Sequence, residues 1–240
     1  MKVAGRMLKR LKFYKKILQI VLSVIEYGIK SILSSHKPEF YDVARNWGKK
    51  MVKIASIQLD IHGIENIKSD ENYIFVANHS SLFDIPILQA TIPNPFRIMY
   101  KKELEKVPFF GLVLKKSPYI VIDRDESKNA MESLNQAIAA IKTGTSVLIY
   151  PEGTRSKDGK LQEFKRGAFF MASRAAKPII PVTIIGTSKI LPKGSLEFNE
   201  GVIKIIFNPP IEIQSNINRL QEKELMSNIH NILKTQLENN

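Results

Sequence analysis

The sequence predicts an α/β fold: a mixed, largely parallel sheet flanked by helices, preceded by an amphipathic two-helix hairpin. Three observations lead to this prediction. From residue 57 onward, short apolar runs alternate with helical patterns, as in a sheet covered on both faces. Before residue 56 the pattern is helical and rich in lysine. A length of 240 residues fits one domain with an appendage, so we expect a two-helix segment at 1–55 and an α/β domain at 56–240.

The first predicted element is a basic helix. Residues 1–16 carry seven basic side chains and no acid, and the most apolar stretch, 17–25, includes two polar residues. A membrane-spanning helix needs roughly 20 predominantly apolar residues, so an interfacial helix fits this segment better. The basic start resembles a signal peptide, but Glu26 and Lys30 interrupt the apolar region where a cleavage site would follow. We therefore expect the segment to be retained.

The second predicted helix begins after Pro38, which breaks the chain. Apolar residues recur at three- and four-residue steps from 40 to 55, beside three lysines, and Trp47 suits the headgroup level of a membrane. The two helices are predicted to enter one leaflet of an anionic membrane, where each basic residue adds about 1 kcal/mol. The alternative is a hairpin packed on its own domain with its lysines in solvent.

The remaining elements follow in order along the α/β domain. The predicted strands are 57–61, 73–77, 97–100, 119–123, 146–150, 179–185 and 202–207. A helix after Ser127 has one apolar side and ends at Gly144, which suits a C-terminal cap. Two further helices are predicted at 165–176, before Pro178, and at about 218–237.

Composition limits the class of partner. Thirty-six Lys and Arg against 23 Asp and Glu give a net charge of +13, which favours nucleic acid, an anionic membrane or a phosphorylated substrate. The absence of cysteine excludes disulfides, thiolate zinc sites and a Cys nucleophile. No nucleic-acid-binding motif, metal-ligand pattern or phosphate-cradling G-x-x-x-x-G-K-[ST] loop is present. A membrane surface or a phosphorylated substrate is therefore expected, and nucleic acid is not.

The first group of residues with chemical potential is 78–84, Asn-His-Ser-Ser-Leu-Phe-Asp, which directly follows a predicted strand. Active sites of α/β folds lie at the carboxyl ends of strands. If the chain turns at Ser80 and Ser81 into a short helix, Asp84 can hold the His79 tautomer and leave the other ring nitrogen as a general base. The alternative is a polar turn in which Asp84 caps the next helix. No G-x-S-x-G elbow marks a serine hydrolase.

The second group is 150–156, Tyr-Pro-Glu-Gly-Thr-Arg-Ser, again at the end of a predicted strand. Arg155 offers a forked donor for phosphate or carboxylate, and Gly153 permits close backbone approach. The Lys-Arg-Gly at 165–167 opens a helix whose N-terminus favours an anion. The alternative is a surface loop held by an ion pair between Glu152 and Arg155.

Together these two segments resemble the 1-acylglycerol-3-phosphate acyltransferases of the glycerolipid acyltransferase superfamily. Three further segments in the same order resemble the family as well: Lys-Lys-Glu-Leu at 101–104 with Pro-Phe-Phe-Gly at 108–111, Ile-Asp-Arg at 122–124, and Ile-Pro-Val at 180–182 ending at Gly186. The resemblance covers roughly residues 57–210. One difference is Ser-Pro-Tyr at 117–119, where the family often has glycine.

The resemblance implies an enzyme that acylates the sn-2 hydroxyl of lysophosphatidate to give phosphatidate. It implies a thioester donor, on acyl carrier protein or coenzyme A, with no cofactor and no metal. His79 would be the general base and Asp84 its orienting partner. The residues implied around the glycerol phosphate are Lys101, Arg124, Glu152, Gly153, Thr154 and Arg155. The enzyme would work on an anionic membrane surface, at the cytoplasmic face of the cell membrane.

Two alternatives stay open. One is another glycerolipid or lysophospholipid acyltransferase, with glycerol 3-phosphate or lysophosphatidylcholine as acceptor. The other, from a different class, is a basic lipid-binding module without catalysis. Backbone N–H groups at 152–154 are candidates for stabilising the oxyanion of an acyl-transfer intermediate.

Overall fold

The computed structural model describes residues 2–34, 38–123, 127–194 and 199–239. Its centre is a seven-stranded sheet in the order β1-β7-β6-β2-β5-β3-β4. The strands are β1 (Ile57–His62), β2 (Ile74–Ala77), β3 (Phe96–Lys101), β4 (Ile120–Ile122), β5 (Ser146–Ile149), β6 (Ile179–Ile185) and β7 (Gly201–Phe207). Only β6 and β7 pair antiparallel, and the other neighbouring strands pair parallel. The predicted mixed, largely parallel sheet is therefore confirmed.

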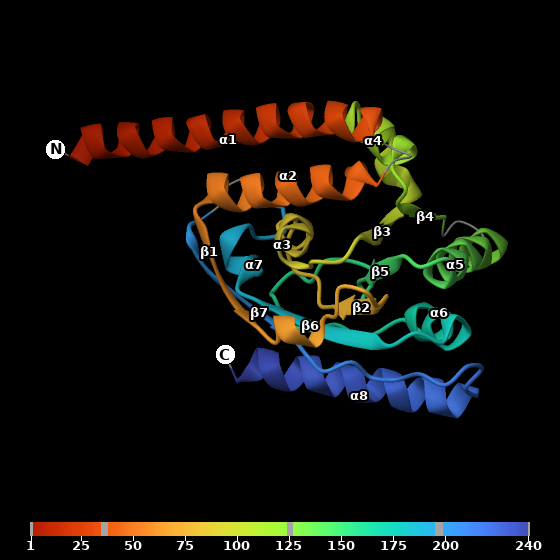
Figure 1. The fold of residues 1–240 in the computed structure, drawn as a ribbon. Coiled ribbons are helices and arrows are strands. Elements are labelled where there is room, and N and C mark those ends of the chain that lie inside the picture. Colours follow the sequence, from red (N-terminus) through yellow and green to blue (C-terminus); the bar gives the residue numbers. More distant parts are fainter. Residues whose placement is uncertain (1, 35–37, 124–126, 195–198, 240) are drawn as a thin grey trace.

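Helices cover both faces of this sheet (Figure 1). They are α1 (Lys2–Leu33), α2 (Glu39–Ala55), α3 (Asp84–Thr91), α4 (Phe110–Lys116), α5 (Ser127–Lys142), α6 (Gly167–Ala175), α7 (Thr187–Ile190) and α8 (Arg219–Glu238), with 3₁₀ turns at Ile64–Asn66 and Lys102–Lys106. Residues of α2, α3 and α7 share a core with one face, and residues of α5, α6 and α8 share a core with the other. Helix α1 lies outermost, along α2 (Figure 1).

Strand β2 shows why the sheet is buried on both sides. Phe75 and Ala77 face the core with α2 and α3, whereas Ile74 and Val76 face the core with α5 and α6. Side chains alternate along a strand, so an uninterrupted apolar run fills both faces, which is typical of parallel sheets. Burying each such large side chain contributes about 1.5–3 kcal/mol. The strand that precedes His79 is thus held at the centre of the fold.

Helix α2 packs closely on α3. A Cβ atom at Gly48 would lie 2.5 Å from the carbonyl oxygen of Pro86, so only glycine allows this approach of the two backbones. The buried side chains of α2 are Phe40, Ala44, Met51 and Ala55. Its apolar face therefore contacts protein, as in the packed alternative, and α2 shares a core with the domain predicted at 56–240.

Helix α1 is different, because its apolar side is exposed. Eight large apolar side chains recur at three- and four-residue steps along it; this α1 stripe consists of Leu11, Tyr14, Leu18, Val21, Leu22, Ile25, Ile29 and Leu33. On its inner side α1 contacts α2 and α4, and a Cβ at Gly28 would lie 2.6 Å from the Phe109 ring. None of the helices in the described ranges has both the length and the apolar character to cross a membrane.

Candidate active site

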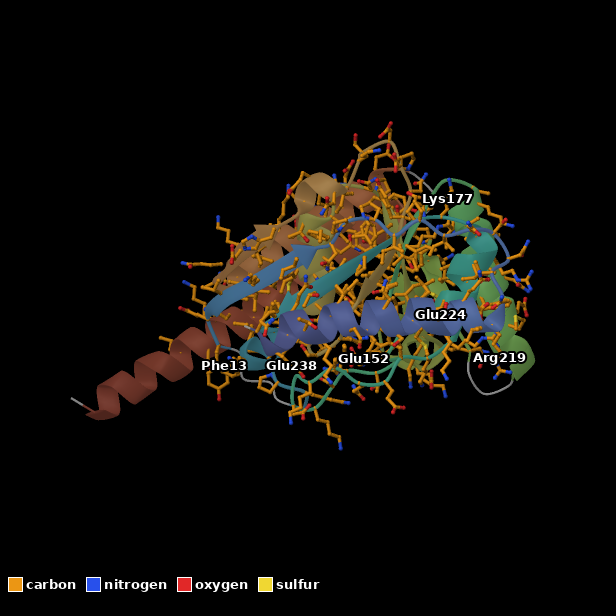
Figure 2. The ribbon with its side chains drawn as sticks, turned by 90° about the horizontal axis from the view of Figure 1, so that it is seen from below. Phe13, Glu152, Lys177, Arg219, Glu224 and Glu238 are labelled. Atoms are coloured by element: carbon orange, nitrogen blue, oxygen red, sulfur yellow. The ribbon has the colours of Figure 1, made fainter. Side chains whose placement is uncertain are left out.

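Two polar loops meet at one edge of the sheet because the strands before them are neighbours. Strands β2 and β5 pair in parallel, with Val76 opposite Ile149, and the loops 78–83 and 150–166 follow directly. In Figure 2, Glu152 lies on the side of the molecule opposite Lys177, which precedes β6. The carboxyl ends of β2, β5 and β6 therefore share the edge near Glu152, where ligands of α/β folds bind.

His79 and Asp84 are hydrogen-bonded at this edge. His79 Nδ1 lies 2.8 Å from Asp84 Oδ2, and the Asp84 side chain is fully buried while 16% of the His79 side chain is exposed. The same oxygen accepts the backbone N–H groups of Ser80 and Ser81, each at 2.8 Å. Asp84 therefore holds both the turn and the imidazole ring. A neutral imidazole that donates from Nδ1 carries its lone pair on Nε2, which is the nitrogen suited to accept a proton.

Tyr150 fixes the plane of the His79 ring. The two ring centroids lie 4.0 Å apart and the rings are 17° from parallel. Burial, and after it the charge of Asp84, raises the pKa of the Tyr150 hydroxyl well above its usual value, so the ring stays neutral. No local sequence motif marks this contact. The signal lies in the register of β2 and β5, which places Tyr150 beside the chain entering His79, and register is not readable from one sequence.

Glu152 binds the backbone on which His79 lies. Its Oε1 accepts the N–H of His79 at 2.7 Å, and its Oε2 accepts the N–H of Gln162 at 3.0 Å. The carbonyl oxygen of His79 in turn accepts the N–H of Ser156 at 2.8 Å. Only 3% of Glu152 is exposed, and this burial raises the pKa of its carboxyl group while the two backbone hydrogen bonds lower it. No ion pair joins Glu152 and Arg155 in the described part of the chain.

The other residues of this loop lie next to Glu152. Gly153 has a φ of 74°, which favours glycine, and its N–H donates to the carbonyl oxygen of Tyr150 at 3.0 Å. This N–H is therefore committed to the turn rather than available to an oxyanion. Thr154 is exposed. Arg155 is half-buried, and its backbone carbonyl accepts a hydrogen bond from Lys193 Nζ at 2.6 Å.

Of the two remaining predicted site residues, one lies farther along the edge. Lys101 ends β3, the strand beyond β5; it is exposed, with its Nζ 3.9 Å from Glu103 Oε1. Arg124 lies outside the described residues. Over those same described ranges, no three His, Cys, Asp or Glu side chains are grouped as metal ligands.

The geometry suits proton abstraction from a hydroxyl group near an anion. A buried carboxylate orients the imidazole, an aromatic ring covers one imidazole face, and a loop with one arginine lies beside it. A general base held in this way typically accelerates a reaction on the order of 10²–10⁴-fold.

Known proteins are similar to this chain in sequence and in fold. The Acyltransferase family model matches residues 58–185. The chain is 31% identical over 198 residues to the chloroplastic 1-acyl-sn-glycerol-3-phosphate acyltransferase BAT2 of Brassica napus, covering 81% of this chain and 57% of that protein. It is also 31% identical over 185 residues to the 1-acyl-sn-glycerol-3-phosphate acyltransferase of Borreliella burgdorferi, covering 77% of this chain and 74% of that protein. The chain thus spans little more than half the length of the plant relative.

A solved structure is similar over the whole chain. The crystal structure of the 1-acyl-sn-glycerophosphate acyltransferase PlsC from Thermotoga maritima superposes with a TM-score of 0.79 at 26% sequence identity, covering 100% of this chain and 97% of that one. The similarity therefore includes the two N-terminal helices as well as the sheet.

Proposed function

The chain belongs to the acyltransferase family that includes the 1-acyl-sn-glycerol-3-phosphate acyltransferases, and on this premise we propose that it acylates lysophosphatidate. The fatty acyl group moves from a thioester to the sn-2 hydroxyl and phosphatidate is formed. The observation that carries the proposal is the 2.8 Å hydrogen bond between His79 and the fully buried Asp84, at the sheet edge that also carries Arg155. The relatives' names supply the substrate class.

In the proposed reaction, Nε2 of His79 takes the proton of the acceptor hydroxyl as its oxygen attacks the thioester carbonyl. A C–O bond forms, the C–S bond then breaks, and the leaving thiolate takes the proton from the imidazolium. Asp84 stabilises that imidazolium through Nδ1. A thioester is already activated, so the alcohol can attack it directly without an acyl-enzyme, and the chain contains no cysteine to form one.

Acceptor binding is assigned to the cationic residues along the same edge. A guanidinium matches two phosphate oxygens at once, so Arg155 is the main phosphate ligand in this proposal, with Thr154, Lys101 and Arg124 around it. Holding the phosphate places the hydroxyl at His79, which supplies orientation rather than proton transfer. Glu152 acts differently: both of its oxygens accept backbone N–H groups, so it positions the His79 backbone and does not face the phosphate.

The enzyme is proposed to work at the membrane surface, on the cytoplasmic face, because its acceptor resides in the bilayer. The α1 stripe supports an interfacial helix, with apolar side chains toward lipid and basic ones toward the headgroups. Exposed Phe110 and Leu112 lie on α4, which packs against α1 and extends the apolar surface. Helix α2 joins α1 to the core and is assigned no lipid contact.

A choice of acceptors tests the proposal. Purified full-length protein is given an acyl-coenzyme A or acyl-carrier-protein donor with lysophosphatidate, glycerol 3-phosphate or lysophosphatidylcholine. We expect thiol release that depends on lysophosphatidate and a phosphatidate product. A preference for either other acceptor reassigns the enzyme within its family. Thiol release that none of the three acceptors increases indicates a lipid-binding module without catalysis.

A further inference from the structure

A basic groove lies between the two N-terminal helices and the sheet. Its volume is about 860 Å³, and it opens between α1, α2 and the residues just before β1 and β7. Its charged lining, called here the lysine groove, consists of Lys15, Lys16, Lys49, Lys50, Lys53 and Glu200. Five cations and one acid thus share one concavity.

Three of these cations are uncompensated. Lys16 Nζ bonds Glu200 at 2.6 Å, and Lys50 Nζ bonds Glu26 on α1 at 2.6 Å. No carboxylate of the described ranges lies within ion-pair distance of Lys15, Lys49 or Lys53, and all three are exposed. Like charges gathered in one concavity raise the local positive potential and attract a compact polyanion.

The lysine groove lies at the catalytic edge of the sheet. Ser56 precedes β1 and Glu200 precedes β7, and the first residues of the two strands are paired. Because β7 runs antiparallel to β6, its start lies beyond the end of β6, where Ile185 pairs with Lys204. The segment after β6 links the two sites: the carbonyl oxygen of Ile190 accepts the N–H of Asn199, next to Glu200, at 2.8 Å, and that of Leu191 accepts the hydroxyl of Ser81, two residues after His79, at 3.0 Å. Across the strands, two to three spacings, about 10–15 Å, separate β7 and β1 from β2. Figure 2 agrees, with Phe13 of the groove lining and Glu152 on the same side of the molecule, opposite Lys177.

We propose that the lysine groove binds the phosphate end of the thioester donor, an inference that rests on the proposed acyl transfer. Both donors considered above carry a phosphate at the far end of a pantetheine arm, and coenzyme A adds a phosphorylated nucleotide there. From sulfur to phosphorus the arm has about thirteen bonds, the backbone length of roughly four extended residues, so it spans about 14–15 Å. A phosphate in the groove therefore leaves the thioester within reach of His79.

The shape of the groove favours this ligand over a membrane surface. A bilayer presents its headgroups as a flat layer. Such a layer contacts lysines that are exposed on a convex helix face. The uncompensated lysines instead line a concavity together with Glu200 and Ser56. A small molecule that carries several phosphates enters such a site, and the α1 stripe remains available to lipid.

Coenzyme A binding without lipid tests the proposal directly. Titration calorimetry on the full-length protein compares wild type with the double variant Lys49→Gln/Lys53→Gln. The control is Lys223→Gln/Lys234→Gln on α8, which removes two charges from the opposite face. We expect the affinity for coenzyme A to fall about tenfold or more in the groove variant, since each 1.4 kcal/mol is a factor of ten. The control should match wild type, and pantetheine, which lacks phosphate, should bind all three proteins weakly.

Equal coenzyme A affinity in the groove variant and wild type, or no measurable binding by wild type, overturns the proposal. Sedimentation with phosphatidylglycerol vesicles forms the second arm. If the groove variant loses vesicle binding while its affinity for coenzyme A is unchanged, the lysines hold lipid headgroups and the proposal fails. Calorimetry measures binding without turnover, so the two proposals can fail separately. If wild type binds coenzyme A through the groove but does not acylate lysophosphatidate, the proposed function is refuted and the groove proposal is not.

Discussion

The carboxylate of Glu152 accepts the backbone N–H of His79 at 2.7 Å and thereby joins two polar segments that are 73 residues apart in the chain. The loop after β5 holds the backbone of His79, through Glu152 and Ser156, while Asp84 holds its ring. The site is therefore a pair of interlocked loops rather than an isolated histidine and aspartate. Predictions for both loops follow from this contact.

Glu152→Gln should lower kcat and leave the KM for the acceptor nearly unchanged. The amide keeps the volume, but its NH₂ group faces a backbone N–H, and leaving a buried donor without a partner costs about 1–3 kcal/mol. We expect kcat to fall about tenfold or more in steady-state assays. Glu163→Gln, at an exposed position of the same loop, is the matched control. A raised acceptor KM with normal kcat would place Glu152 at the phosphate instead.

Arg155→Ala should chiefly raise the KM for lysophosphatidate. Hydrogen bonds to charged groups contribute about 1.5–3 kcal/mol, which corresponds to a rise of roughly ten- to a hundredfold. Arg155→Lys keeps the positive charge but lacks the paired N–H donors of the guanidinium, so its KM should lie between those of the alanine variant and wild type. Lys160→Ala, with its side chain 86% exposed, controls for the loss of one positive charge. An unchanged acceptor KM in Arg155→Ala removes this residue from the phosphate site.

Leu18→Glu/Leu22→Glu should release the protein from anionic vesicles. Both side chains belong to the α1 stripe and are 58% and 56% exposed, so the change leaves the core intact. Full burial of a leucine in an apolar environment contributes about 1.5–3 kcal/mol, and we expect vesicle binding to fall at least tenfold. Leu220→Glu, an equally exposed leucine on α8, should sediment like wild type. Undiminished sedimentation of the α1 variant contradicts the assignment of α1 to the interface.

Glu26 should make the attachment of α1 to α2 sensitive to acid. Hydrogen bonds from Lys30, and then from Lys50, lower the pKa of Glu26 from 4.5 to about 2. A depressed carboxyl pKa stabilises the folded state above the unfolded value, and this contribution is lost as pH falls from about 4.5 toward 2. Glu26→Gln should melt at a lower temperature than wild type at pH 7, and the difference should vanish near pH 2. A difference in Tm that is independent of pH would show that the ion pairs are not its cause.

Much of this architecture could be predicted because local signals agree with tertiary structure. Each predicted strand was found within two residues of its expected ends. The helix for which Gly144 is the expected C-terminal cap ends at Lys142, and Gly144 follows it with a φ of 93°. The hydrogen bond between His79 and Asp84 was expected from two serines in a turn before a helix, and it is present. The apolar runs alone carried no information on strand order, which depends on long-range pairing.

The parts that could not be predicted depend on contacts between distant segments. An amphipathic pattern does not show whether its apolar side meets lipid or protein. The pattern of α2 predicts a contact with lipid, whereas Gly48 of this helix packs on Pro86. The sequence also does not show which groups a carboxylate binds. The family resemblance implies that Glu152 lies around the glycerol phosphate, whereas its two oxygens accept the backbone N–H groups of His79 and Gln162. The short helix α4 was missed because its seven residues are too few to show a helical period.

The rate of acceptor-dependent thiol release by His79→Ala, at saturating lysophosphatidate and thioester, tests the central claim most directly. If Nε2 of His79 is the general base, kcat should fall about 10²–10⁴-fold, with the thermal unfolding transition unchanged. Asp84→Asn should show a comparable loss, because its amide cannot stabilise the imidazolium as a carboxylate does. A folded His79→Ala protein that turns over at the wild-type rate would contradict the account.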